Sequence, residues 1–267
     1  MKTKSYLVYA LCAILQPFNF ANAQIVWLTT RNMDFSNADR EERKVEKFTS
    51  INNSVPFDII YEQSAVQKVV VEGDREYFDR LHTDVVKGVL EINMDRGRYR
   101  NVRLRIRISS PEIESIRIAG SGDLLCTSDI KAKGDFTLRV AGSGDIEMQS
   151  IYCKAFSSSV AGSGDIRVND IKGTDVEIKV SGSGDFKASD VVGENLSTSI
   201  AGSGDIKIGL ATIGDGLSAS VAGSGDISIN GSARDVKARV VGSGDIHGKL
   251  NYENISKVKS GSGGIEW

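Results

Sequence analysis

The stretch Val140-Ala141-Gly142-Ser143-Gly144-Asp145-Ile146 decides the fold of this chain, because its core, Gly-Ser-Gly-Asp, recurs throughout the second half of the sequence. Successive aspartates of the seven copies are 22, 20, 20, 20, 21 and 19 residues apart, and an eighth copy ends in Gly264 in place of aspartate. Repetition at a nearly fixed period of this length is typical of a solenoid, in which each repeat makes one turn. The seven aspartates are Asp123, Asp145, Asp165, Asp185, Asp205, Asp226 and Asp245.

Apolar and polar residues alternate within each repeat, which predicts short strands with one buried face. An inward pair precedes the glycines, as at Leu138 and Val140, and another inward position follows the aspartate, as at Ile146. No repeat has room for an amphipathic helix, and parallel crossovers are right-handed in about 98% of cases. We therefore predict an all-β fold, a right-handed single-stranded parallel β-helix of about eight turns. Its core is expected to contain Phe136, Phe156 and Phe186.

The first part of the chain has no repeat but is also β-rich. The runs Lys68–Glu72, Val89–Ile92 and Val102–Ile108 predict strands, and Asp74–Val86 predicts a short helix. Since an open sheet edge promotes aggregation, we expect this part to cover the first turn of the β-helix. The predicted organisation is a signal peptide at residues 1–23, an N-terminal β-rich cap at 24–110 and the β-helix at 111–267.

The N-terminal residues predict export. Lys2 and Lys4 precede the apolar run Tyr6–Leu15, and Ala21-Asn22-Ala23 supplies small residues for signal-peptide cleavage. The apolar run is shorter than the ~20 residues of a transmembrane helix. We therefore expect a soluble chain in the periplasm, at the outer membrane or outside the cell. The formal net charge of −2 over 267 residues predicts no attraction to nucleic acid.

The sequence resembles the auto-transporter adhesin "head GIN" domain family of exported Bacteroidota proteins. The resemblance runs from about Lys44 to Asp245. It rests on the opening Val45-Glu46-Lys47-Phe48, on Leu90-Glu91-Ile92, and on Ile116-Arg117-Ile118-Ala119-Gly120-Ser121-Gly122-Asp123 with its copies. The resemblance implies an exported β-helical envelope protein, and it brings no established catalytic residues.

Each Gly-Ser-Gly-Asp has two interpretations. In the first, the glycines provide the positive φ angles of a tight corner, while the serine and aspartate side chains bond to loose backbone N–H groups. In the second, the seven aspartates, stacked ~4.8 Å apart, form a weak calcium ladder, because calcium prefers oxygen ligands. The known calcium-binding glycine–aspartate repeat has a shorter period. The turn interpretation is therefore favoured, and no other cofactor is predicted.

The repeats carry no unique cluster of acids and bases. Catalysis needs one preorganised constellation, whereas the prominent acid of this chain is copied in every turn. We therefore predict a non-catalytic exported envelope or adhesin-like protein, with a binding or structural role. Its repetitive surface would face an envelope polymer, a glycan or another protein. The alternative is a polysaccharide-binding or polysaccharide-cleaving protein similar to the β-helical pectinases.

An arginine-rich segment precedes the first repeat. Arg103, Arg105 and Arg107 alternate, which places them on one face of the predicted strand. This face could meet anionic lipid or polysaccharide. The favoured interpretation is a solvated outer face, paired with Glu112 and Glu114 just downstream.

Three other residues have a chemistry that the repeat does not explain. Cys126 and Cys153 stand at different positions of neighbouring repeats, so a disulfide between them is left open. His247 lies two residues from Asp245 on one strand face, and we interpret this pair as solvated surface.

The last turn departs from the pattern of the others. The alternation of apolar and polar residues slips by one position over Ile255–Lys259. Terminal repeats of a solenoid have no outer neighbour and are usually atypical. We expect Trp267 to act as a hydrophobic lid on this end.

Overall fold

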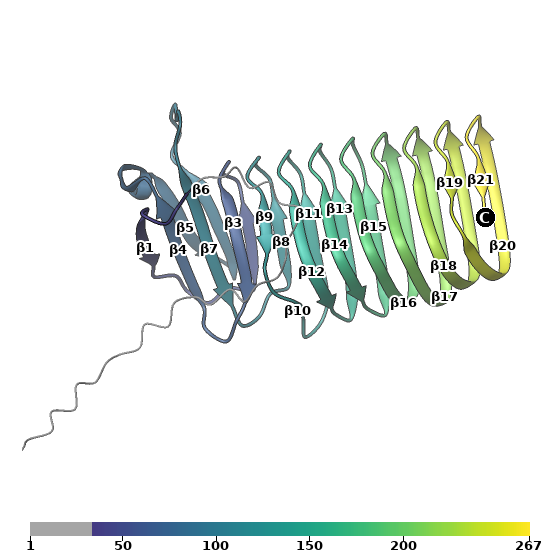
Figure 1. The fold of residues 1–267 in the computed structure, drawn as a ribbon, viewed down its shortest axis with the longest axis horizontal. Helices are drawn as coiled ribbons and strands as arrows, with labels where there is room; N and C mark the ends of the chain where they lie inside the picture. The colour runs from purple at the N-terminus through teal and green to yellow at the C-terminus, as the bar shows by residue number, and fades with distance from the viewer. Residues whose placement is uncertain (1–33) are drawn as a thin grey trace, which may run out of the picture.

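Strand follows strand along residues 34–267, the part of the chain that the computed structural model describes (Figure 1). A single sheet contains 21 strands, and the one helix in this range is the short 3-10 helix η1 (Arg75–Arg80). No helix among these residues is long and apolar enough to cross a membrane. The predicted signal peptide at residues 1–23 lies outside the described residues.

Each turn of the repeat region has one strand before the Gly-Ser-Gly-Asp corner and one after it. Successive turns pair in parallel, so that Ile146 lies opposite Ile166 and Val160 lies opposite Val180. The predicted all-β parallel β-helix, with about eight turns, is therefore confirmed.

The turns are closed in two ways along the solenoid. In the earlier turns, separate strands lie before and after each corner. In β16, β17 and β18, one strand follows the corner and continues around the second corner of the turn into the next face, whereas the last turn is again divided, into β19 and β20. The separate strands are β8 (Ser115–Ile118), β9 (Leu124–Cys126), β10 (Ile130–Lys131), β11 (Phe136–Val140), β12 (Ile146–Tyr152), β13 (Ala155–Val160), β14 (Ile166–Lys172) and β15 (Asp175–Val180). The later strands are β16 (Phe186–Gly202), β17 (Ile206–Gly223), β18 (Ile227–Gly242), β19 (Ile246–His247), β20 (Leu250–Gly261) and β21 (Ile265–Glu266).

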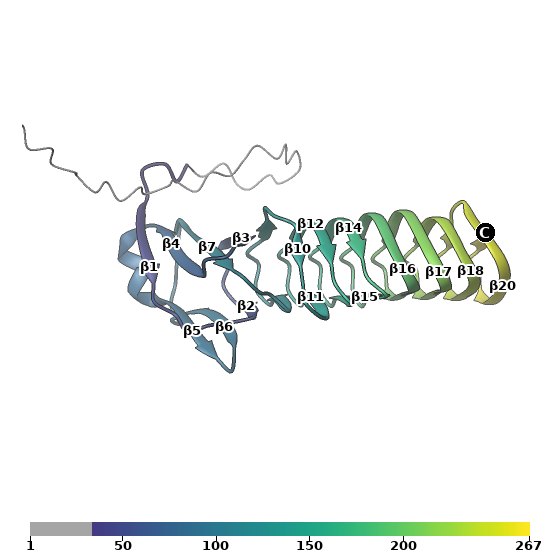
Figure 2. The same ribbon diagram turned by 90° about the horizontal axis from the view of Figure 1, so that it is seen from below.

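The core lies between the two faces of the flattened solenoid. Figure 2 shows β12 and β14 on one side and β11 and β15 on the other. The predicted inward columns are buried on both faces, because side chains that alternate along each strand stack in register from turn to turn. Leu138, Val140, Ile146 and Ile166 are each at most 1% exposed. Phe136, Phe156 and Phe186 are also in the core, with neighbouring ring centroids 6.5 Å apart.

The rungs at the N-terminal end do not stack in chain order. The strands β2 (Ser50–Asn53) and β3 (Asp58–Gln63) form one rung, which pairs in parallel with β8 and β9 on one side. On its other side this rung pairs with β6 (Val89–Met94) and β7 (Leu104–Ser110). The chain therefore forms the inner rung, β2 and β3, before the outer rung, β6 and β7. Residues 111–114 then lead back to β8, where the repeats begin.

Three antiparallel strands lie at this end. β4 (Lys68–Gly73) pairs with β7, β1 (Asp39–Arg43) pairs with β4, and β5 (Leu81–Val86) pairs with β6. The strands predicted at Lys68–Glu72 and Val89–Ile92 are β4 and the first part of β6, while the one predicted at Val102–Ile108 begins two residues later as β7.

The helix predicted over Asp74–Val86 is wrong in its second half. The short helix η1 ends at Arg80, and the chain continues as strand β5. Leu81 and Thr83 are buried while His82 and Asp84 are exposed. Burial that alternates from one residue to the next is typical of a strand. The segment pairs with β6, and this pairing outweighs its local preference for a helix.

The last rung keeps its backbone register, so the slip of the apolar–polar alternation over Ile255–Lys259 changes which side chains face inward. Lys257 lies opposite Ala238 and Lys259 lies opposite Val240, which places both lysines at inward positions of the rung. Trp267 packs partly buried against the core, as a lid would, and its carbonyl oxygen accepts hydrogen bonds from Tyr252 and Lys257.

Candidate functional site

The corner aspartates form a continuous ladder of hydrogen bonds along the solenoid. Asp145 Oδ1 accepts the backbone N–H of Asp165 at 2.8 Å, and Asp165 Oδ1 accepts that of Asp185 at 2.8 Å. The ladder begins at Asp58, whose Oδ1 accepts the N–H of Asp123, and it ends at the N–H of Gly264. The other bonds of the ladder link Asp123 to Asp145, Asp185 to Asp205, Asp205 to Asp226, and Asp226 to Asp245.

The second carboxylate oxygen meets cations in the middle of the ladder. Arg167 donates to Oδ2 of both Asp145 and Asp165, and Lys187 donates to Oδ2 of Asp185 at 3.0 Å. Burial acts to raise the pKa of Asp185, but the N–H of Asp205 and the Lys187 ammonium outweigh it, so this pKa lies below its usual value. At Asp123 burial prevails and raises the pKa. Two basic residues thus reduce the repulsion among the central carboxylates.

Close approach of the rungs accounts for most of the corner glycines, rather than the predicted positive φ. A Cβ on Gly162 would lie 2.1 Å from the carbonyl oxygen of Gly142, and one on Gly164 would lie 2.1 Å from that of Gly144. Among the described glycines of the repeated word, φ is in the left-handed range only at Gly223, Gly242 and Gly261. The corner therefore needs glycine because the neighbouring rung occupies the space of a side chain.

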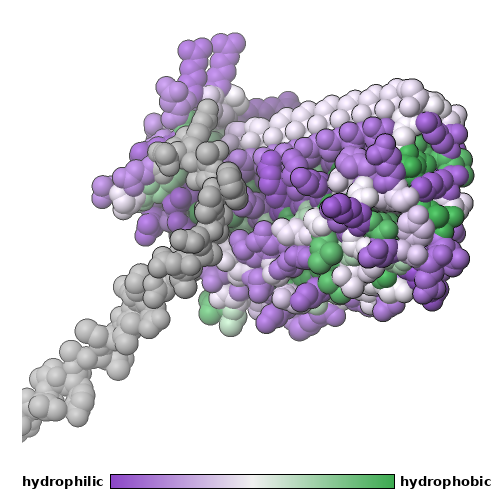
Figure 3. Space-filling model, turned by 45° about the vertical axis from the view of Figure 1, so that its right-hand side comes forward, coloured by the Kyte–Doolittle hydropathy of each residue, from purple (hydrophilic) through white to green (hydrophobic). Residues whose placement is uncertain are grey.

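The repeated word builds a pale, straight ridge along one edge of the molecule (Figure 3). Its serines are exposed, and they form a row that follows the axis. No group of three or more His, Cys, Asp or Glu side chains in residues 34–267 is arranged to hold a metal ion. Every Oδ1 of the ladder accepts an N–H, so the turn interpretation has a geometric basis. Calcium binding by the ladder stays a prediction.

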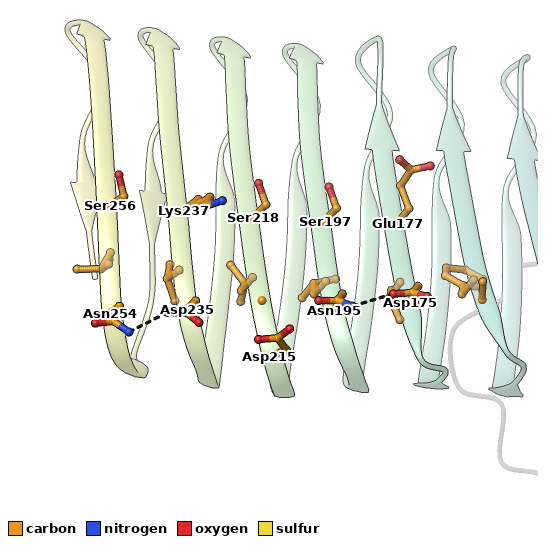
Figure 4. Close-up of a pocket in the computed structure, with 18 of the residues that line it drawn as sticks. Asp175, Glu177, Asn195, Ser197, Asp215, Ser218, Asp235, Lys237, Asn254 and Ser256 are labelled. Atoms are coloured by element: carbon orange, nitrogen blue, oxygen red, sulfur yellow. Dashed lines mark hydrogen bonds between the residues drawn. The ribbon is translucent and has the colours of Figure 1, made fainter.

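A second surface feature, which the sequence analysis did not identify, is a groove along the solenoid axis. It has a volume of about 780 Å³ and lies over β13 to β20, on the strands that precede the corners. Figure 4 shows its two rows of polar side chains. Buried apolar residues such as Leu196 stand between the rows in the chain and also line the groove. We call it the axial groove. One row is Asp175, Asn195, Asp235 and Asn254, with Gly216 at this position in β17 and Asp215 next to it in the chain; the other row is Ser157, Glu177, Ser197, Ser218, Lys237 and Ser256.

Hydrogen bonds across rungs order the first row of the axial groove. Asn195 donates to Asp175 at 2.9 Å, and Asn254 donates to Asp235 at 2.8 Å (Figure 4). Arg234 bonds to both Asp215 and Asp235. These amides and carboxylates repeat at the rung spacing of ~4.8 Å, so the groove presents similar polar groups to each successive segment of an extended ligand.

The serines of the second row keep the axial groove open. At the position of Ser197, the next turn also has a small side chain, Ser218, whereas the preceding turn has Glu177. Serine stands two residues after asparagine at Asn195/Ser197 and at Asn254/Ser256, and this spacing is visible in the sequence. It identifies a groove only when the strands are known to stack in register.

Arg103, Arg105 and Arg107 pair with acidic residues other than the predicted Glu112 and Glu114. Arg105 and Arg107 belong to β7, and Arg103 directly precedes it. Arg105 and Arg107 bond to Glu72, which is 2% exposed, at 2.7 and 3.0 Å. Burial acts to raise the pKa of Glu72, but hydrogen bonds and charge from both arginines hold it below the usual value. Arg103 meets Asp74. Glu112 bonds to Lys133 and Glu114 to Thr49, because the chain turns away from β7 after residue 110.

Cys126 and Cys153 are free thiols. Cys126 is buried and its Sγ donates to the carbonyl oxygen of Ser128, while Cys153 is half-buried. Burial raises the pKa of Cys126 to about 12 and that of Cys153 to about 11, so neither thiol ionises readily.

These features define a β-solenoid with a grooved, repetitive surface. The sequence profile of the family described as "Putative auto-transporter adhesin, head GIN domain" matches residues 47–233, and the chain belongs to this family. No match was found among curated proteins.

Solved structures from two Parabacteroides species are similar over nearly their whole length. A "putative lipid binding protein" from Parabacteroides distasonis is 29% identical, with a TM-score of 0.76, covering 86% of this chain and 96% of that one. A "putative adhesin" from the same organism is 21% identical, with a TM-score of 0.76 and the same coverage. Another, from Parabacteroides merdae, is 18% identical, with a TM-score of 0.75 and the same coverage. The two adhesin structures, at 21% and 18% identity, show only that the fold is similar.

Proposed function

We propose that this chain is a non-catalytic, exported envelope protein with an adhesin-like role, and that it holds an extended polymer in the axial groove. The groove carries this proposal, because it runs over six rungs and lines them with two polar rows. Ligand sites combine an apolar floor with a few placed polar groups. The family's adhesin description supports a binding role.

The ligand class follows from the groove lining. Serine hydroxyls and Asn/Asp side chains donate and accept hydrogen bonds with the hydroxyls and amides of a glycan or a peptide backbone. Repetition along the axis favours a polymer over a compact small molecule, since each rung adds one more similar contact. The partner is then an envelope polymer, a glycan or an extended segment of a neighbouring protein.

The polysaccharide-cleaving alternative has less support. The acids Asp175 and Asp235 of the groove have similar surroundings, because each is paired with an asparagine of the next rung, Asn195 or Asn254. A glycosidase needs one general acid placed against one base or nucleophile. We therefore propose binding without turnover.

The experiment is a panel of neutral and charged polysaccharides with two readouts, binding and release of reducing ends. Ser197→Trp and Ser218→Trp should fill the groove and abolish binding of the neutral polysaccharides, whereas Ser203→Trp, on the exposed ridge, should not. Release of reducing ends would contradict the non-catalytic proposal. Loss of binding only in Asp165→Lys or Asp185→Lys would move the site to the aspartate ladder.

The location in the envelope is proposed from the predicted signal peptide and the family. Cleavage after Ala23 would leave Gln24 as the first residue. Intact-mass measurement of the protein recovered from the producing bacterium tests this. Retention of Met1–Ala23 would contradict it.

A further inference from the structure

One rung has an enlarged corner. Five residues, 119–123, join β8 to β9, whereas nine residues, 95–103, join β6 to β7 on the outermost parallel rung. Because β6 pairs with β2 and β7 with β3, this segment stands at the same edge as the glycine corners. It rises above them in Figure 1. We call residues 95–103 the arginine loop.

The loop presents cations that nothing in the described chain neutralises. Arg96, Arg98 and Arg100 are exposed, and none of them makes a side-chain hydrogen bond or ion pair with another of residues 34–267. Beyond them Arg103 meets Asp74, and Arg105 is paired with Glu72. Three free guanidinium groups therefore lie within five residues of a chain whose net charge is negative.

The base of the loop is ordered by contacts that leave the arginines outside. The Tyr99 hydroxyl donates to the carbonyl oxygen of Asp95 at 2.6 Å, and the Tyr99 ring packs edge-on against Tyr77 at 6.0 Å. The Asp95 N–H donates to the carbonyl oxygen of Arg80 at 3.0 Å. A loop held in this way loses less conformational entropy when a ligand binds it.

We propose that the arginine loop binds acidic polysaccharide. The guanidinium fork donates two parallel hydrogen bonds to a carboxylate or sulfate group, and three forks on one loop contact successive groups of a polyanion. A membrane is a poorer partner, because a loop that inserts at a lipid surface exposes aromatic or apolar anchors. Tyr99 packs back on Tyr77, and Val102 packs against the core.

This site is separate from the axial groove, so its test does not depend on the proposed function. The probes are polygalacturonate, which carries carboxylates, and dextran sulfate, with neutral dextran and phosphatidylglycerol vesicles as comparisons. The variant is Arg96→Gln/Arg98→Gln/Arg100→Gln. The matched control, Lys154→Gln/Lys207→Gln/Arg239→Gln, removes the same charge from exposed positions of the solenoid.

The wild-type protein is expected to bind at least one of the two polyanions and not dextran, with an affinity that falls as salt rises from about 0.05 to about 0.3 M. The loop variant should bind about tenfold or more weakly, and the control should change less than about twofold. Melting temperatures should be unchanged in both, because the replaced side chains are exposed. Equal losses in the two variants, no binding to either polyanion, or binding to vesicles alone would overturn the proposal.

Discussion

The Oδ1 atom of Asp165 accepts the backbone N–H of Asp185, one rung further along the solenoid, at 2.8 Å. The carbonyl group of Asp185 meanwhile accepts the N–H of Ile166, so the corner of one rung is fixed twice to its neighbour. In a parallel stack the strand ladder provides only the second of these bonds. The aspartate side chain supplies the first where the backbone turns.

Replacing Asp165 should separate the hydrogen bond from the charge. Asp165→Asn retains an acceptor for the Asp185 N–H and should be mild. Asp165→Ala leaves that N–H without its partner and should cost about 1 kcal/mol of unfolding free energy. Urea unfolding of the two variants measures the difference. If Asn were as damaging as Ala, the role of Asp165 would lie in its charge pair with Arg167.

Calcium should leave the stability almost unchanged, because the Oδ1 atoms already accept N–H groups and Arg167 and Lys187 contact the central Oδ2 atoms. A specific site at a hundredfold excess over its dissociation constant would add about 2.7 kcal/mol. Thermal melting with calcium and with chelator tests this. A large, chelator-reversible rise in melting temperature would show that the ladder binds the ion.

Two glycine-to-alanine substitutions test the close approach of the rungs. The Cβ of Gly164→Ala would lie 2.1 Å from a backbone oxygen, so the rungs must separate, and we expect a loss above about 3 kcal/mol. Gly134→Ala is the matched control, because nothing lies within 4 Å of its Cβ. Similar melting temperatures for the two variants would contradict the packing explanation.

The pH dependence of stability should reflect Glu72. Its folded pKa is lowered, so its contribution is fully present above the unfolded value, near 4.5, and is lost as pH falls through the folded value. Glu72→Gln should cost about 3 kcal/mol at neutral pH, since Arg105 and Arg107 lose their buried partner, and the cost should shrink in acid. Denaturant unfolding across the pH range measures it. Glu112→Gln, on an exposed pair, should change little at any pH.

The repeat region could be predicted from the sequence because each turn repeats the same local pattern. Ile146 and Ile166 fall in one column as soon as their repeats are aligned, and the structure keeps that register. The N-terminal rungs could not be predicted in this way. Ile51 pairs with Leu90 on one side and Ile116 on the other, and no repeated word marks those partners.

The candidate sites were predictable to different degrees. The corner aspartates can be identified in the sequence because they recur in every repeat. Their hydrogen bonds depend on the distance between rungs, which cannot be read from the sequence. The axial groove arises only when residues such as Asp175 and Ser197, about one turn apart, stand side by side. The partner of Arg105 is Glu72, 33 residues away, and only the antiparallel pairing of β4 with β7 brings them together.

The last prediction concerns the final rung, whose outer edge pairs with no other strand of residues 34–267. Lys257 and Lys259 continue columns that hold Ala238 and Val240 one rung earlier, so the inward positions of this edge are charged. Inward charges at a sheet edge disfavour pairing with another sheet, because a further rung would bury them. Lys257→Val/Lys259→Val should therefore raise end-to-end self-association, as a concentration-dependent increase in mass by analytical ultracentrifugation. The control, Lys237→Val/Arg239→Val, removes the same charge from outward positions. Its self-association should equal that of the wild type. Equal association of both variants would mean that net charge, and not the inward placement of the lysines, keeps this edge free.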